Sequence, residues 1–231
     1  MKPSLQQTTA ILVFANSSRE ELKYKPFAKN GVLFDELTQH TLQTVEKTKL
    51  PYFHFTEQQQ IGTTFGERFT HAIQTIFDKG YDNVITLGND TPQLKTSHIL
   101  EAHGHISAGK PVLGPSVDGG FYLMALKKSC FDAFRFKGLS WQTNTLYSEI
   151  SLLLENAGFD IFSLSVLRDL DTIRDAKSLL NHMTSISLGL FRVLTAIFSI
   201  KKIRVVRSLC FTGTQDYCIH FNKGSPSLLL F

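Results

Sequence analysis

Cysteine is scarce in this chain, and so are long hydrophobic runs. Only three of the 231 residues are cysteines: Cys130, Cys210 and Cys218 cannot all pair and lack the spacing of a metal-ligand set. So little cysteine favours a reducing compartment over a disulfide framework. Residues 1–9 are polar and show no signal peptide. The apolar stretch near the C-terminus, interrupted by Arg192, is too short to span a membrane, so we expect a cytoplasmic protein with no transmembrane segment.

An excess of charge of one sign is missing as well. The formal net charge is +4 and charged residues make up 19% of the chain, with basic side chains gathered at Lys201, Lys202, Arg204 and Arg207. A positive charge this small and this local does not predict a nucleic-acid partner. The hydrophobic share of 42% is ordinary for a globular protein, excludes disorder as the main state and can supply one substantial core.

Several catalytic and cofactor motifs are also absent. The sequence contains no P-loop, no glycine-rich dinucleotide fingerprint and no recognisable Ser-His-Asp or Cys-His arrangement. The eight histidines form no ligand set; His103 and His105, for example, are two positions apart and would not share a helix face. The carboxylates remain as the candidates for the chemistry of this chain.

Hydrophobic patterns divide the chain into alternating strands and helices. Apolar runs typical of buried strands occur at residues 9–15, 52–55, 83–87, 111–114, 119–126 and 160–164. Helical periodicity occurs at residues 33–45, 65–77, 96–105, 142–156 and 172–183. The polar segment 16–30 is expected to be a loop. This order predicts a three-layer α/β/α architecture with a mostly parallel sheet, in which 119–126 is the candidate for an antiparallel strand.

Three acidic residues adjoin predicted strands. Asp90 directly follows the third strand, Asp118 lies in the glycine-rich segment 114–120, and Asp171 comes just beyond the last strand. Ligands bind at the carboxyl ends of strands in such sheets, and Mg²⁺ binds one or two carboxylates together with substrate phosphates. The same residues are also typical of turns and helix caps, with Asp90 placed shortly before Pro92. Both interpretations stay open at this point.

Basic, aromatic and glycine residues add candidates for ligand binding. Arg68 lies at the start of the helix 65–77, where a phosphate can bind, although it is equally typical of a solvated first turn. Trp141, the only tryptophan, can stack on a base or sugar or pack in the core. Gly119 and Gly120 let the backbone approach a ligand closely, or form a tight turn.

The motifs occur in a recognisable order along residues 9–180. They are Gln60…Gly66-Glu67-Arg68, Gly88-Asn89-Asp90-Thr91-Pro92-Gln93-Leu94, Gly114-Pro115…Asp118-Gly119-Gly120-Phe121-Tyr122-Leu123, Trp141 and Asp169-Leu170-Asp171-Thr172…Asp175. As a set they resemble a bacterial glycosyltransferase-A-like family, whose members are described as glycosyltransferases of unknown substrate and are sometimes associated with radical-SAM proteins.

The resemblance implies a nucleotide-diphospho-sugar transferase (GT-A) fold, shared with sugar-1-phosphate nucleotidylyltransferases and molybdenum-cofactor guanylyltransferases. It further implies that Asp90 and Asp171 hold Mg²⁺ or Mn²⁺. Lys23 and Lys25 lie where the family carries its nucleotide-binding loop and would neutralise a diphosphate. The segment 16–27 nevertheless lacks the glycine that the family loop contains.

These observations predict a metal-dependent transferase with a nucleotide-diphospho-sugar donor and a small-molecule acceptor. Asp90 and Asp171 would hold the metal at the reacting diphosphate, Arg68 or Lys25 would add positive charge, and Asp118 would orient the acceptor hydroxyl or take its proton. One alternative is a nucleotidylyltransferase that acts on a phosphorylated acceptor. Another, suggested by the altered segment 16–27, is a non-catalytic nucleotide-binding relative.

The predicted domain organisation separates a GT-A-like domain at residues 1–183 from a C-terminal extension at residues 184–231. The extension combines apolar residues with the basic ones noted above. Such a segment can pack on its own domain, form a homodimer contact or make a peripheral membrane contact.

Overall fold

The computed structural model describes residues 8–25, 31–180 and 187–197. The chain divides into two units, Met1–Leu194 and Thr195–Phe231, and only residues 195–197 of the second are described. The fold given below is therefore that of the first unit. The basic residues expected in the tail, at 201–207, lie outside the described residues, as do residues 184–186 of the predicted extension.

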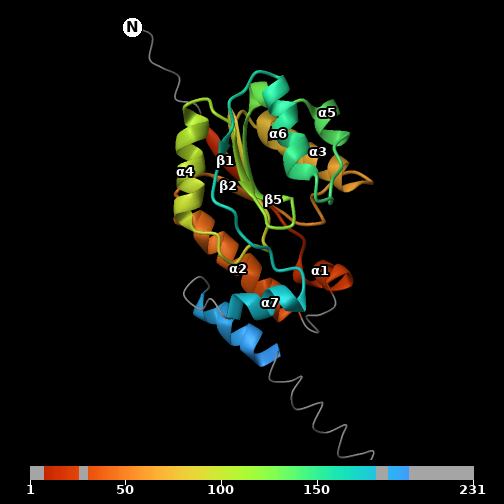
Figure 1. Cartoon of the computed structure of the whole chain (residues 1–231), viewed down its shortest axis with the longest axis vertical. Helices are drawn as coiled ribbons and strands as arrows, with labels where there is room; N and C mark the ends of the chain where they lie inside the picture. Colours follow the sequence, from red (N-terminus) through yellow and green to blue (C-terminus); the bar gives the residue numbers. More distant parts are fainter. Residues whose placement is uncertain (1–7, 26–30, 181–186, 198–231) are drawn as a thin grey trace, which may run out of the picture. The chain divides into compact units, whose positions relative to one another are not determined.

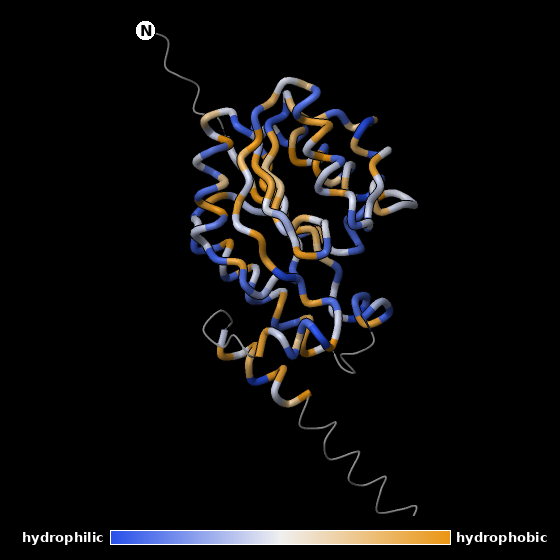
Figure 2. The backbone as a smooth tube through the Cα atoms, viewed as in Figure 1, coloured by the Kyte–Doolittle hydropathy of each residue, from blue (hydrophilic) through white to orange (hydrophobic). Residues whose placement is uncertain are grey.

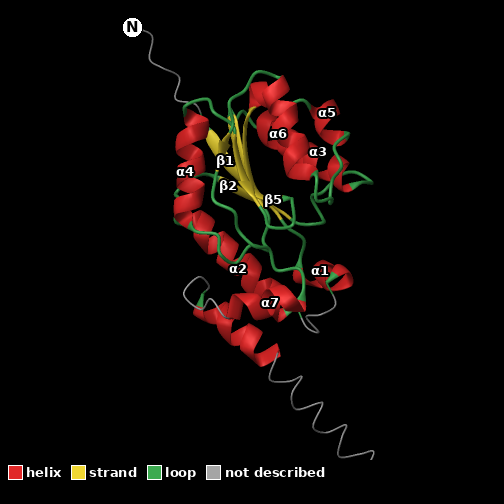
Figure 3. Cartoon of the chain, viewed as in Figure 1, coloured by secondary structure: helices red, strands yellow, loops and turns green. Residues whose placement is uncertain are grey.

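A six-stranded sheet forms the centre of the first unit (Figure 3). Its strands are β1 (Thr9–Phe14), β2 (Tyr52–Phe55), β3 (Asn83–Leu87), β4 (Val112–Pro115), β5 (Phe121–Lys127) and β6 (Phe162–Ser163), in the order β2-β1-β3-β5-β4-β6. Only β5 runs antiparallel to its neighbours, β3 and β4. The prediction of a mostly parallel sheet with one reversed strand is confirmed.

Helices cover both faces of this sheet (Figure 1). They are α1 (Ser18–Tyr24), α2 (Val32–Glu46), α3 (Phe65–Asp78), α4 (Thr96–Ser107), the 3₁₀ turn η1 (Lys128–Cys130), α5 (Ala133–Lys137), α6 (Leu146–Asn156) and α7 (Ile173–Leu180). Helices α2 and α4 pack on one face, and α3, α5 and α6 on the other. Among the described residues no helix is both long and apolar enough to cross a bilayer.

Strand β1 shows why the central strands are apolar throughout. Ala10 and Leu12 face α3 and α6, whereas Ile11 and Val13 face α2 and α4, and all four are fully buried. Because both faces are covered, the strand needs no polar alternation, and Figure 2 shows the resulting hydrophobic centre. Each fully buried Leu or Ile side chain contributes roughly 1.5–3 kcal/mol to folding.

The segment expected to be a loop after β1 contains the helix α1 instead. Ser17 caps it by accepting a hydrogen bond from the Glu20 amide, and Glu20 and Glu21 lie in its first turn, where the helix dipole favours negative charge. No residue of α1 is buried. The helix therefore leaves no hydrophobic periodicity in the sequence, and the prediction of a loop was wrong for this reason.

Two further differences concern the second half of the chain. Helix α6 begins at Leu146 and not at residue 142, because Gln142 has a φ of 62°, which a right-handed helix excludes. The short helix α5, capped by Asp132, was not predicted, since its five residues are too few for a periodicity. At the end of the first unit, residues 188–194 are helical, and Leu190 and Leu194 are fully buried.

Candidate active site

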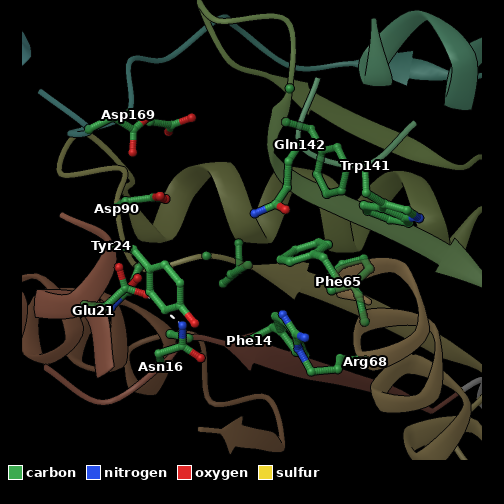
Figure 4. Close-up of a pocket in the computed structure, with 18 of the residues that line it drawn as sticks. Phe14, Asn16, Glu21, Tyr24, Phe65, Arg68, Asp90, Trp141, Gln142 and Asp169 are labelled. Carbon is green, nitrogen blue, oxygen red and sulfur yellow. Dashed lines mark hydrogen bonds between the residues drawn. The ribbon is translucent and has the colours of Figure 1, made fainter. Parts of the chain in front are cut away.

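A pocket of about 800 Å³ lies at one edge of the sheet. At this edge β1 and β3 end and the reversed strand β5 begins. Figure 4 shows the carboxylates of Asp90 and Asp169 on one side of the pocket and the rings of Phe65 and Trp141 on the other. Seven of the residues predicted from the sequence line it: Lys25, Arg68, Asp90, Asp118, Gly120, Trp141 and Asp171.

The acidic side of the pocket is built around the ammonium group of Lys25. Its Nζ lies 3.1 Å from Asp90 Oδ2 and 2.6 Å from Asp171 Oδ1. Burial would lower the pKa of Lys25, but the charges of Asp90 and Asp171 outweigh burial and raise that pKa. Burial also raises the pKa of Asp171, an effect that Lys25 offsets in part. The two carboxylates therefore converge on a single positive charge.

Direct hydrogen bonds hold the two acidic segments together. The Leu170 amide donates to the Asp90 carbonyl at 2.8 Å, and the Thr91 hydroxyl donates to Asp169 Oδ1 at 2.5 Å. Leu170 is fully buried. Leu170 does not line the pocket, whereas Asp169 and Asp171 on either side of it do.

Asp169 is a site residue that the sequence prediction did not single out from its motif. Burial, followed by the nearby charge of Asp90, raises the pKa of Asp169 to about 7. The alternation of Asp169 and Asp171 around an apolar leucine was the signal that could have identified it. The acidic side thus contains three carboxylates, of which two contact Lys25.

Asp118 lies on the loop between β4 and β5 and is exposed to solvent. Its Oδ1 accepts a hydrogen bond from the Gly120 amide at 3.0 Å, which fixes the turn. Gly119 does not line the pocket; it has a φ of +92°, and a Cβ there would lie 2.1 Å from the Asn144 carbonyl oxygen. Gly119 therefore allows close contact between two loops and has no place on the pocket wall.

Arg68 lies in the first turn of α3, which begins with a capping box. The Glu67 amide donates to Thr64 Oγ1 at 3.1 Å, and Glu67 Oε2 in turn accepts from the amides of Thr63 and Thr64. Hydrogen bonds from Thr63 lower the pKa of Glu67 to about 2. Arg68 donates to the Thr63 carbonyl oxygen at 3.2 Å while it lines the pocket, so its positive charge is held across the pocket from Asp90 and Asp169 (Figure 4).

Aromatic rings form the wall next to Arg68. Trp141 lies with its ring centre 5.4 Å from that of Phe65 and 5.0 Å from that of Phe69. Its indole N–H donates to the Phe136 carbonyl oxygen at 2.8 Å, and a Cβ on Gly66 would lie 2.5 Å from the indole. The ring is thus held in one orientation, with both the core and the pocket beside it.

The segment after β1 brings unexpected negative charge to the pocket. Glu20 and Glu21 of α1 line it together with Glu57, which follows β2, and Glu21 accepts a hydrogen bond from the Asn16 side chain at 3.0 Å. Burial raises the pKa of Glu21. Lys23, which was predicted to bind a diphosphate, points elsewhere: it is largely exposed, pairs with Glu20 and does not line the pocket. Sequence reasoning missed Glu20 and Glu21 because it treated their segment as a loop.

The donor atoms of the acidic side are suited to Mg²⁺ or Mn²⁺. Both Asp90 and Asp171 offer hard carboxylate oxygens, and Mg²⁺ needs only one or two of these when phosphates supply further ligands. Across the described part of the chain, no group of three or more His, Cys, Asp or Glu side chains is arranged to hold a metal. The fit of the site to a metal therefore depends on the hard oxygens of Asp90 and Asp171, with further ligands to come from a bound phosphate.

Solved structures of two other proteins share this fold. One is a "putative nucleotide-diphospho-sugar transferase" from Desulfovibrio desulfuricans G20, with 22% identity, a TM-score of 0.69, and coverage of 87% of this chain and 98% of that one. The other is the 4-diphosphocytidyl-2C-methyl-D-erythritol synthase of Anaerococcus prevotii DSM 20548, with 13% identity, a TM-score of 0.51, and coverage of 78% and 97%. The predicted fold class is thereby confirmed.

Comparison of sequences places the chain in a family. No curated protein matches it. A family model described as "Uncharacterized protein conserved in bacteria (DUF2064)" matches residues 20–143, which is more than half of the 231 residues. The match includes Lys25, Arg68, Asp90 and Asp118 and ends just before the helix α6. The chain therefore belongs to this bacterial DUF2064 family.

Proposed function

We propose that this protein is a divalent-metal-dependent transferase that uses a nucleotide-diphospho-sugar donor. The observation that carries the proposal is the convergence of Asp90 and Asp171 on one positive charge, at the carboxyl edge of the sheet, in a pocket with an aromatic opposite wall. The volume of about 800 Å³ is within the range of roughly 300–1,000 Å³ that small-molecule sites occupy.

In this proposal Asp90 and Asp171 hold Mg²⁺ or Mn²⁺. When bound, the metal supplies electrostatic stabilisation of the negative charge that develops on a leaving diphosphate. Lys25 and Arg68 approach the diphosphate with positive charge from two sides of the pocket, and Trp141 with Phe65 packs against the base or the sugar. Donor selectivity would then depend on the aromatic wall.

Asp118 is the proposed general base. The bond between the anomeric carbon of the sugar and the diphosphate oxygen breaks, and its electron pair leaves with the diphosphate. A new bond forms from the acceptor oxygen to the anomeric carbon, and the proton of that hydroxyl passes to Asp118. Exposure of Asp118 at the pocket leaves it open to a small-molecule acceptor, as a general base requires.

Nucleotidyl transfer from a nucleoside triphosphate to a phosphorylated acceptor is the second candidate. It needs the same acidic residues and the same neutralisation of phosphate charge. The likeness of the fold to a protein named as a diphosphocytidyl-methylerythritol synthase supports keeping it. Products separate the two reactions, because only nucleotidyl transfer releases pyrophosphate, whereas sugar transfer releases a nucleoside diphosphate.

Thermal unfolding with a panel of nucleotides and nucleotide sugars, with and without Mn²⁺, tests the proposal. A ligand at about 100 times its Kd stabilises the native state by about 2.7 kcal/mol, so a true donor raises Tm by several degrees. We expect this rise for a nucleotide sugar with Mn²⁺ and its loss in Asp90→Asn. Asp160→Asn, which removes a surface carboxylate paired with Lys110, is the matched control and should behave as wild type.

Product analysis on the nucleotide sugar with the greatest thermal shift completes the test. Release of the nucleoside diphosphate supports sugar transfer, and pyrophosphate from a triphosphate supports the second candidate. A protein that binds a nucleotide but never turns it over, with any acceptor sugar or phosphate, would be the non-catalytic relative. A chain that binds no nucleotide or nucleotide sugar at all would contradict all three.

A further inference from the structure

Lys25 occupies the place between the two carboxylates that are proposed to hold the metal. Its Nζ lies 2.6 Å from Asp171 Oδ1 and 3.1 Å from Asp90 Oδ2, close enough to each for a charge-assisted hydrogen bond. The side chain is only 19% exposed, compared with 62% for Lys23. Lys25 is therefore part of the acidic centre and does not belong to the solvated surface of α1.

A divalent ion and this ammonium would compete for the same oxygens. Mg²⁺ binds carboxylate oxygens at about 2.0–2.1 Å, so an ion bound to Asp90 Oδ2 and Asp171 Oδ1 would share both partners of Lys25. Two positive charges at such short range repel each other. One of them has to leave, and the lysine is the one attached through a flexible stem.

The anchoring of Lys25 allows its ammonium to move without its backbone. The Lys25 amide donates to the Glu21 carbonyl oxygen at 2.9 Å, which ties the residue to the end of α1. Four methylene groups then separate this fixed point from the Nζ. The stem can therefore swing within the pocket while α1 stays in place.

We propose that Lys25 is a tethered cation that exchanges with the catalytic metal. Without metal it neutralises Asp90 and Asp171 and holds their two loops at the pocket. Metal binding displaces its ammonium, which then turns to the diphosphate of the donor. This inference rests on the proposed function for the metal and the diphosphate, but it adds an order of events that the proposed function does not require.

The exchange links the metal to the donor. In the absence of donor, the metal has to displace the Lys25 ammonium from its two ion pairs, and the ammonium gains no new partner. The metal alone is therefore expected to bind weakly. A diphosphate offers the displaced ammonium two negative charges, so metal and donor should each strengthen the binding of the other by the same factor. Metal and donor then bind cooperatively, and metal alone occupies the pocket only at higher concentration.

Titration of the full chain with Mn²⁺ alone, followed by calorimetry or by the electron paramagnetic resonance signal of free Mn²⁺, tests the exchange. We expect Lys25→Met, which keeps the length of the stem and removes its charge, to bind Mn²⁺ about tenfold more tightly. This factor applies if the wild-type lysine leaves the carboxylates free for metal in roughly a tenth of the molecules, whereas in the variant they are always free. Lys110→Met, which removes a lysine ion-paired with Asp160 outside the pocket, should leave the Kd unchanged. An equal or weaker affinity in Lys25→Met would overturn the proposal.

A second variant separates this proposal from the proposed function. If wild type and Lys25→Met bind Mn²⁺ equally and both lose it with Asp90→Asn, the metal site stands and only the exchange is wrong. If none of them binds Mn²⁺, the metal site of the proposed function fails and the exchange fails with it.

Lysine labelling tests the exchange in the wild-type chain, without any substitution that could alter the fold. Lys25 should react slowly with an acylating reagent in the absence of metal, and severalfold faster when Mn²⁺ releases its ammonium. Lys110 should react at one rate in both conditions. Equal protection of Lys25 with and without Mn²⁺, under conditions in which calorimetry shows Mn²⁺ bound, would overturn the exchange.

Discussion

Asp118 differs from the other acidic residues of the pocket in its surroundings. Asp90 and Asp171 share the charge of Lys25 and Asp169 accepts from Thr91, whereas Asp118 contacts the Gly120 amide through one oxygen and leaves the other free for a ligand. Its substitution by asparagine preserves this turn, because the amide oxygen can still accept. The variant thus tests chemistry and not structure.

We expect Asp118→Asn to lower kcat by roughly 10²–10⁴-fold, the range that a general base contributes. Donor binding should persist, so the Tm rise with nucleotide sugar and Mn²⁺ should equal that of wild type. Steady-state kinetics and thermal unfolding check the two halves of this prediction. Full turnover in the variant would exclude Asp118 as the base.

Glu67 carries a pH dependence whose sign follows from its depressed pKa. The pKa falls from 4.5 to about 2 in the folded chain, owing first to the hydrogen bonds from Thr63, so the ionised carboxylate stabilises the native state. This contribution is fully present above pH 4.5 and is lost as the pH falls toward 2. The difference in free energy of unfolding between wild type and Glu67→Gln should therefore shrink between pH 6 and pH 3. A difference that stays constant over this range would contradict the assignment.

At the scale of the element, the start of α3 depends on a single hydroxyl. Thr64 Oγ1 accepts from the Glu67 amide, and removal of such a cap costs about 1 kcal/mol. We expect Thr64→Ala to lose this amount in urea unfolding. Thr75→Ala is the control in the same helix, since the Thr75 hydroxyl only donates to the His71 carbonyl oxygen four residues earlier and caps nothing. Equal losses in the two variants would refute the cap.

Two helical glycines give opposite predictions. Gly66 in α3 is in contact with Trp141, and a Cβ would lie 2.5 Å from the indole, whereas a Cβ on Gly104 in α4 would meet nothing within 4 Å. Gly104→Ala should stabilise the chain by roughly 0.5–1 kcal/mol, because alanine has the higher helix propensity. Gly66→Ala should destabilise it by about 1–3 kcal/mol through overpacking.

The same pair of variants reports on the aromatic wall. In Gly66→Ala the indole has to shift away from α3, which should reduce the Tm rise with nucleotide sugar and change the fluorescence of the only tryptophan. Gly104→Ala should leave both signals as in wild type. An unchanged emission spectrum in Gly66→Ala would show that Trp141 is not held against the helix.

The helices and strands that could be predicted from the sequence are mainly those with buried side chains. Strands β1 and β3 are buried on both faces and so appear as continuous apolar runs, and α3 shows a helical period because one face is buried. Helix α1 contains no fully buried residue, and its polar sequence concealed it. The hydrophobic pattern of a sequence reflects which side chains are buried. Helices and strands that are stabilised mainly by caps and charges therefore cannot be predicted from it.

The candidate site was predictable only in part, for a related reason. Asp90 and Asp171 could be proposed because each follows a strand, and strand ends share an edge of the sheet. The ion pairs of Lys25 could not be predicted, because they depend on the position that α1 gives to this lysine and α1 itself was not predicted. Pairings between residues 65 or more positions apart, such as Lys25 with Asp90, are set by tertiary packing and leave no local signal.

At the scale of the whole molecule, the position of the domain boundary is open to test. The sequence predicts a domain of residues 1–183, whereas the first compact unit extends to Leu194. Within the added residues Leu190 and Leu194 are fully buried, and a Cβ on Gly189 would lie 2.6 Å from Glu36 Oε2 of α2. Residues 187–194 of the predicted extension therefore pack within the first unit.

Two shortened chains distinguish these boundaries. A chain that ends at Leu194 keeps both buried leucines and every residue of the pocket, so its Tm should lie within about 4 °C of the full chain, the shift that about 1 kcal/mol produces at this size. A chain that ends at residue 183 loses both leucines, and each buried leucine removed costs about 2–5 kcal/mol. It should melt at least about 8 °C lower. Equal melting of the two shortened chains would place the boundary at 183. A chain ending at Leu194 that melts well below the full chain would instead mean that residues beyond 194 stabilise the first unit, as a tail that packs on it or forms a dimer contact would do.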